Sequence, residues 1–176
     1  MAAPREFSCS DTLRNGLAVT IRALHADDRE RMAKAVRELD RESVYFRLFS
    51  YRNELTEAGL DRIMTFDPDR EVALVVTTGA GPDEKVIGSG RYVVCGGREG
   101  ALSAEVAFIV EEDYQGLGIA KRLLAHLAAI ARTKGIVEFE ADVLAENESM
   151  LAVFARSRLP MKQRREGGVV HVALAL

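Results

Sequence analysis

Residues 113–120 have the sequence Asp-Tyr-Gln-Gly-Leu-Gly-Ile-Ala and carry the clearest chemical meaning in the chain. They follow an apolar stretch at residues 106–110, which predicts a strand, and precede an amphipathic stretch, which predicts a helix. The first backbone N–H groups of a helix have no partner within the helix, and the helix dipole favours negative charge there. Glycines let a ligand approach the backbone closely. The pattern therefore predicts a site for a phosphate-bearing ligand.

Glu105 is the candidate for acid–base chemistry. It is the only charged residue in residues 101–110, so we expect it to be partly buried. Burial raises the pKa of a carboxyl group toward the range that suits a general base. A general base of this kind can, for example, take a proton from an ammonium group, whose nitrogen becomes a nucleophile only after losing it. The alternative for Glu105 is a water-facing position on an edge strand.

Two other phosphate-binding motifs do not fit the glycine loop. A dinucleotide-binding fingerprint needs a third glycine where Lys121 stands, and it needs a different order of strands before it. A Walker A loop needs Gly-Lys-Ser or Gly-Lys-Thr, which the sequence lacks. Gly88 and Gly90 also lack the third glycine, and their setting is typical of a strand interior.

The surrounding pattern predicts a mixed α/β domain. Strands are expected at residues 17–21, 72–78, 86–95, 101–110 and 137–144, and two more are expected on either side of Gly167-Gly168. Helices are expected from Asp27, around residues 42–49, from Thr56, over 120–134 and over 147–156. Residues 1–12 lack periodicity and predict a flexible arm, which leaves 13–176 as a single domain.

Composition excludes several classes of protein. The chain has 176 residues, of which 48% are hydrophobic and 29% charged, as expected for one folded domain. Its net charge of −3 predicts no nucleic-acid partner. Two distant cysteines and three histidines in unrelated contexts predict neither disulfides nor a metal site. Without a secretion signal or an apolar run long enough to cross a bilayer, we expect a cytoplasmic protein with no membrane association.

The sequence Gln115-x-x-Gly118-x-Ala120 resembles the pyrophosphate loop of the GNAT superfamily of N-acetyltransferases, Gln/Arg-x-x-Gly-x-Gly/Ala. Further segments are similar to the acetyltransferase domain of Pat-type bacterial protein lysine acetyltransferases, at residues 17–22, 43–47, 69–74, 104–107 and 143–147. The resemblance implies a GNAT-like central mixed β-sheet of about six to seven strands flanked by helices. It also implies that acyl-CoA lies in the splay between the fourth and fifth strands.

The resemblance implies roles for individual residues. Acetyl-CoA would be the co-substrate, held by Phe108, Ile109, Val110, Gln115, Gly116, Leu117, Gly118, Ile119, Ala120, Lys121 and Asn147. Glu105 would be the general base, and a backbone N–H at Phe108 or Ile109 would polarise the thioester carbonyl. Asn147 would contact the CoA arm, and it can also cap the helix that follows it.

One residue departs from the family pattern, and the acceptor stays open. Phe154 stands where many relatives have a tyrosine that protonates the leaving thiolate. The thiolate would then leave unaided, or Tyr114, Tyr45 or water would supply the proton. We expect the acceptor to be a protein lysine, for example on an acyl-CoA synthetase. A small-molecule amine acetyltransferase and a non-catalytic acyl-CoA sensor are the alternatives.

Overall fold

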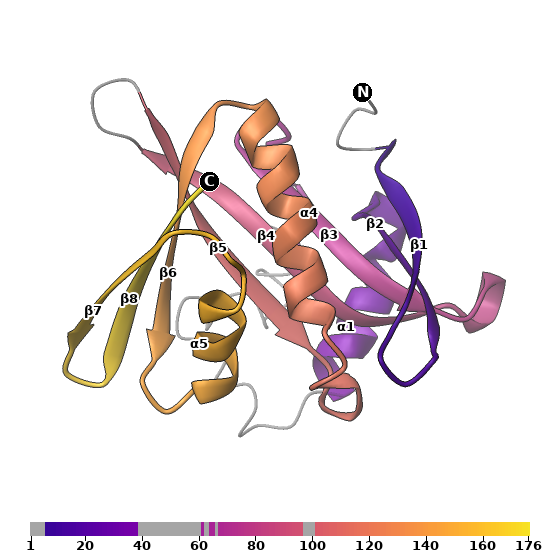
Figure 1. The fold of residues 1–176 in the computed structure, drawn as a ribbon. Coiled ribbons are helices and arrows are strands. Elements are labelled where there is room, and N and C mark those ends of the chain that lie inside the picture. The colour runs from indigo at the N-terminus through magenta and orange to yellow at the C-terminus, as the bar shows by residue number, and fades with distance from the viewer. Residues whose placement is uncertain (1–5, 39–60, 62–63, 66, 97–100) are drawn as a thin grey trace.

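The computed structural model describes residues 6–38, 61, 64–65, 67–96 and 101–176. They form an eight-stranded sheet of order β1-β2-β3-β4-β5-β6-β8-β7 (Figure 1). The strands are β1 (Ser8–Thr12), β2 (Ala18–Ala23), β3 (Glu71–Thr78), β4 (Lys85–Gly96), β5 (Leu102–Val110), β6 (Ile136–Leu144), β7 (Met161–Glu166) and β8 (Val169–Ala175). The helices of the described part are α1 (Arg29–Glu38), α4 (Ile119–Thr133) and α5 (Glu148–Ala155). The mixed α/β class is confirmed.

The expected flexible arm is wrong for residues 8–12. They form β1, which pairs antiparallel with β2 from Ser8↔Arg22 to Thr12↔Ala18 and adds an eighth strand to the six or seven expected. Backbone pairing needs no apolar side chains, so this polar strand leaves little trace in the hydrophobic pattern. Residues 1–5, the helix expected at 42–49 and most of the helix expected from Thr56 lie outside the described residues.

Helices cover the two faces of the sheet. Helices α4 and α5 lie on one face, and α1 lies on the other, behind β3 and β4 (Figure 1). Helix α4 buries Leu123, Leu124 and Leu127 in the main core. Gly88 and Gly90, which lie inside β4 as expected, permit this approach: a Cβ on Gly88 would stand 2.9 Å from a side-chain methyl of Ile119, and one on Gly90 would stand 3.3 Å from the Cβ of Leu123. The small residues thus set how closely α4 packs on the sheet.

Strands β5 and β6, the fourth and fifth strands of the sequence prediction, separate as expected. They pair in parallel only from Leu102↔Ile136 to Glu105↔Glu140. Beyond that rung β5 stays paired with β4 up to Val110, and β6 stays paired with β8 up to Leu144. We call the point after Glu105 and Glu140 the fork.

Asp28 anchors the start of α1 through a buried ion pair. Its carboxylate accepts hydrogen bonds from Arg22 at 2.7 and 2.8 Å and from the backbone N–H of His25 at 2.9 Å. Burial raises the pKa of Asp28, but the hydrogen bonds from Arg22 and His25 outweigh it, so this pKa lies below its ordinary value.

The lowered pKa of Asp28 predicts acid sensitivity. The carboxylate stabilises the fold above the unfolded-state pKa, about 3.9, and this contribution is lost as the pH falls through the folded-state pKa. Asp28→Asn should lower the free energy of unfolding by about 2 kcal/mol at neutral pH and weaken its fall between about pH 5 and pH 3. Urea titration checks both effects. Asp27→Asn, at the exposed neighbouring position, should change neither.

Arg158 takes a strained backbone conformation just after α5. Its φ of 65° is the left-handed value that favours glycine. Among the described residues other than glycine, Arg158 alone has a positive φ. Arg158→Gly should raise the free energy of unfolding by about 1 kcal/mol, because the relief of strain exceeds the added freedom of the unfolded chain. Thermal unfolding checks this. Arg158→Ala, which removes the side chain but keeps the strain, should give no gain.

Candidate functional site

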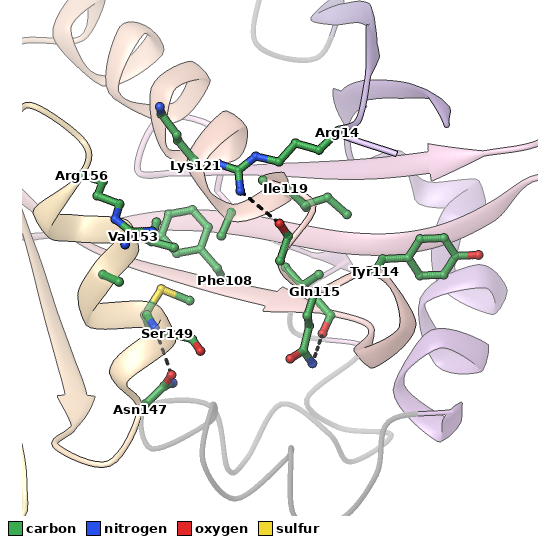
Figure 2. A pocket seen from close by; sticks show the side chains of 16 residues that line it. Arg14, Phe108, Tyr114, Gln115, Ile119, Lys121, Asn147, Ser149, Val153 and Arg156 are labelled. Atoms are coloured by element: carbon green, nitrogen blue, oxygen red, sulfur yellow. Dashed lines mark hydrogen bonds between the residues drawn. The ribbon is translucent and has the colours of Figure 1, made fainter. Parts of the chain in front are cut away.

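A cleft of about 310 Å³ lies between α4 and α5 over the end of β5 (Figure 2). Its lining includes most of the predicted ligand-binding residues: Phe108, Val110, Gln115, Gly116, Gly118, Ile119, Ala120, Lys121 and Asn147. Two predicted residues lie elsewhere. Leu117 packs partly buried against the core, and Ile109 lines a small cavity beneath α1 on the other face.

The glycine loop has the conformation that its sequence predicts. Gly116 and Gly118 have φ values of 72° and 91°, which side-chain-bearing residues rarely adopt. Gly118 is the N-cap of α4, and because glycine has no side chain it does not cap the N–H groups at the start of the helix. The first backbone N–H groups of α4 have no partner within the helix, so this end suits an anion bound in the cleft.

Arginine side chains tie the N-terminal β1–β2 hairpin to this loop. Arg122 donates to Asp11 at 2.6 Å and to the carbonyl of Thr12 at 2.8 Å, and it also reaches the carbonyl oxygens of Leu117 and Gly118. The backbone N–H of Thr12 and the Arg122 guanidinium hold the pKa of Asp11 below its ordinary value, although partial burial opposes them. The hairpin thereby helps to fix the position of the loop.

Arg14, at the tip of this hairpin, is a site residue that sequence reasoning missed. It lines the cleft and donates to the carbonyl of Gly116 at 3.3 Å (Figure 2). A signal for it existed, because Asn15-Gly16 is the type of dipeptide that most strongly predicts a two-residue hairpin turn. A hairpin turn at this dipeptide predicts that the residues before it form a strand paired with the residues after it, and the structure has this arrangement in β1 and β2.

Helix α5 supplies the opposite wall of the cleft. Ser149, Ala152, Val153 and Arg156 follow the i, i+3, i+4, i+7 spacing of one helical face, a signal that could have identified them. Arg14, Lys121 and Arg156 thus bring three cations to the cleft from three different elements (Figure 2). Asn147 caps α5 by accepting a hydrogen bond from the N–H of Met150 at 3.1 Å.

Backbone direction in β5 distinguishes the two candidate oxyanion donors. The N–H of Glu111 donates to Ile87 of β4, and backbone direction alternates along a strand, so the N–H of Ile109 also points to β4. Phe108 therefore directs its N–H toward the fork. The carbonyl of Val110 points the same way, because it accepts a 3.5 Å hydrogen bond from the Gln115 side chain in the loop.

The expected partial burial of Glu105 is wrong, because its side chain is exposed. Strand β5 alternates, and Ala104, Val106, Phe108 and Val110 are buried on the face that carries α4. Glu105 must then lie on the opposite face, at the last rung before the fork. The lone charge in an apolar run marked the strand's second face rather than a buried position.

Phe154 lies in the core rather than at a reacting position. It is 1% exposed, and its ring centre lies 6.2 Å from that of Phe108 at the back of the cleft. Tyr114 lines the cleft, but its ring points away from Gln115 (Figure 2). Tyr45 lies outside the described residues.

The described part of the chain contains neither a metal-binding cluster nor a membrane-spanning helix. No three His, Cys, Asp or Glu side chains among them are grouped so that they could hold a metal ion. No helix in the same part of the chain combines the length and apolar character needed to cross a membrane.

Comparisons with known proteins agree with this geometry. The model of the acetyltransferase (GNAT) family matches residues 33–158. Acetyltransferase PA5475 of Pseudomonas aeruginosa is 31% identical over 140 residues, covering 80% of this chain and 74% of that protein. Acetyltransferase Pat of Mycolicibacterium smegmatis is 36% identical over 147 residues, covering 82% of this chain but only 42% of that protein.

A solved structure shares both sequence and fold with the chain. The GNAT domain of S. lividans PAT is 33% identical, with a TM-score of 0.84, over 96% of this chain and 97% of that one. The family match, the two relatives and this fold all point to one reaction class. The chain belongs to the GNAT acetyltransferase family and is an acetyl-CoA-dependent N-acyltransferase.

Proposed function

We propose that the chain transfers the acetyl group of acetyl-CoA to the ε-amine of a protein lysine, with Glu105 as general base. One observation carries the proposal: the cleft opens on one face of the sheet at Phe108 and Val110, just beyond the fork, and Glu105 lies on the other face at the last rung before it. An acyl donor and an amine acceptor can therefore approach the same point from opposite sides. The likeness to Pat-type proteins supports a protein acceptor.

The residues of the cleft fit coenzyme A. Its diphosphate would accept hydrogen bonds from the backbone N–H groups of the glycine loop and the first turn of α4, next to Lys121 and Arg14. The pantetheine arm would lie along the edge of β5 beyond the fork, where β5 no longer pairs with β6, near Asn147, and would pair with the backbone as an added strand does. The N–H of Phe108 would then donate to the thioester oxygen as negative charge develops on it.

Glu105 would accept one proton from the lysine ammonium, directly or through a water molecule. The freed amine nitrogen forms a bond to the acyl carbon, and the bond from that carbon to sulfur breaks. The sulfur leaves as a thiolate, because Phe154 has no proton to donate. The attacking nitrogen gives up its second proton to solvent water, so the product is a neutral amide. A thiol of ordinary pKa, about 8.5, is an adequate leaving group without that help.

Labelled acetyl-CoA added to a bacterial lysate, with and without the protein, tests the proposed acceptor. Mass spectrometry should find label on lysines of particular proteins, with an acyl-CoA synthetase the first candidate. Label on small amines alone would favour the small-molecule alternative. Thermal stabilisation of the protein by acetyl-CoA, without transfer to any component, would favour a sensor.

Free thiols at Cys9 and Cys95 suit the reducing cytoplasm in which we place the reaction.

A further inference from the structure

A second carboxylate lies directly beside the proposed base. Glu140 of β6 is the partner of Glu105 in the last rung of the parallel β5–β6 ladder. Neighbouring strands lie about 4.8 Å apart, and paired residues point to the same face, so both side chains stand on the face opposite the cleft. Both are exposed. Any acceptor that reaches Glu105 from this face therefore meets Glu140 as well.

The charges at this rung are not balanced within the described part of the chain. Neither Glu105 nor Glu140 has an ion-pair partner there. By contrast, Asp142, the next residue of β6 on the same face, is hydrogen-bonded to His171 at 2.5 Å. Like charges directly opposite each other in a sheet are destabilising. A cation between the two carboxylates would relieve that repulsion, and the acceptor ammonium is such a cation.

The surface leaves room for that cation to arrive. Glu140 lines an open groove of about 260 Å³ on this face, which runs from β6 over β8 to Lys162 and Arg164 on β7. A side chain borne by another molecule can therefore reach Glu140 from solvent without moving any described element. The groove and the cofactor cleft lie on opposite faces of the sheet. Glu140 of the groove stands at the last rung before the fork, and Phe108 of the cleft lies on β5 just beyond it.

We propose that Glu140 is a positioning residue that holds the acceptor ammonium beside Glu105. The inference rests on the proposed function and adds to it the recognition of the acceptor: a cationic amine is bound between two carboxylates before one of them takes its proton. Glu140 itself takes no part in bond formation. Its removal should therefore weaken acceptor binding and leave the chemical step in place.

Glu138 provides a matched control for this position. It has the same side chain, strand and face as Glu140, but it lies opposite Ser103 instead of Glu105. If the face acted only through its overall negative charge, Glu138→Gln and Glu140→Gln would have equal effects. If the position beside Glu105 matters, Glu140→Gln should weaken acceptor binding and Glu138→Gln should not.

A double-mutant cycle tests the contact. The enzyme forms are wild type, Glu140→Gln, Glu140→Asp and Glu138→Gln, each saturated with coenzyme A, which cannot transfer an acyl group. The partner is the acceptor protein labelled in the lysate experiment, with its target lysine intact or changed to glutamine. Calorimetry measures the dissociation constant of each pair. Steady-state rates with acetyl-CoA give kcat and KM for the same enzymes.

Loss of the target lysine should weaken binding to wild type about five-fold, the effect of a partly exposed ion pair. It should have a clearly smaller effect on binding to Glu140→Gln, in which Glu105 alone remains beside the ammonium, while Glu138→Gln should keep the wild-type difference and Glu140→Asp part of it. Glu140→Gln should raise KM for the acceptor with little change in kcat. Equal coupling at Glu138 and Glu140, or none at Glu140, overturns the inference. Absence of transfer by wild type overturns the proposed function instead.

Discussion

Replacing Glu105 with glutamine is expected to lower kcat by about 100-fold or more, while the dissociation constant for acetyl-CoA stays unchanged. Glutamine keeps the size of the side chain but cannot accept a proton from the ammonium. Glu105 also lies on the face opposite the cleft, so cofactor contacts should survive. The rate of CoA-thiol release measures kcat, and calorimetry measures the binding of acetyl-CoA.

The pH dependence of this variant has a definite direction. Without its base it must rely on amine that is already deprotonated, and that fraction rises about ten-fold per pH unit below the lysine pKa of about 10.4. The residual rate of Glu105→Gln should therefore climb more steeply with pH than the wild-type rate. Glu138→Gln, on the same face of the next strand, should retain the wild-type kcat. Wild-type turnover by Glu105→Gln would remove Glu105 from its proposed role.

Replacing Gly118 with alanine is expected to weaken acetyl-CoA binding by about 50-fold or more. The φ of 91° at Gly118 is unfavourable for any side chain, and a Cβ there would lie 2.6 Å from a guanidinium nitrogen of Arg122. Arg122 cannot move away freely, because Asp11 and the carbonyl of Thr12 hold it. The loop should shift instead and lose more than one N–H donor, each worth about 1.5–3 kcal/mol when it bonds a charged group.

Gly116→Ala separates the two causes. Gly116 has a similar φ of 72°, but a Cβ there would meet nothing within 4 Å. This variant should show the backbone strain alone and a clearly smaller loss of affinity. Calorimetric titration with acetyl-CoA compares the two variants, and their melting temperatures report the strain. Equal losses of affinity would show that the contact with Arg122 does not hold the loop in its binding conformation.

Local sequence pattern was sufficient for the glycine loop and for α4. A glycine at each position of positive φ, and apolar residues at helical spacing, specify a strand–turn–helix unit through interactions between near neighbours. The pattern itself predicted an anion site at residues 113–120, and the resemblance to a family added Phe108, Val110 and Asn147. The separation of β5 from β6 was expected from the resemblance to a family and not from the pattern itself.

Tertiary structure decided what depends on distant contacts. The hydrogen bond from Arg14 to Gly116 joins residues 102 positions apart, and no local pattern encodes it. The alternation of β5 predicts that Glu105 and Phe108 have opposite faces, but only packing decides that α4 covers the face of Phe108 and leaves Glu105 exposed. The pairing of Glu105 with Glu140 likewise depends on strand register, which the assembled sheet sets.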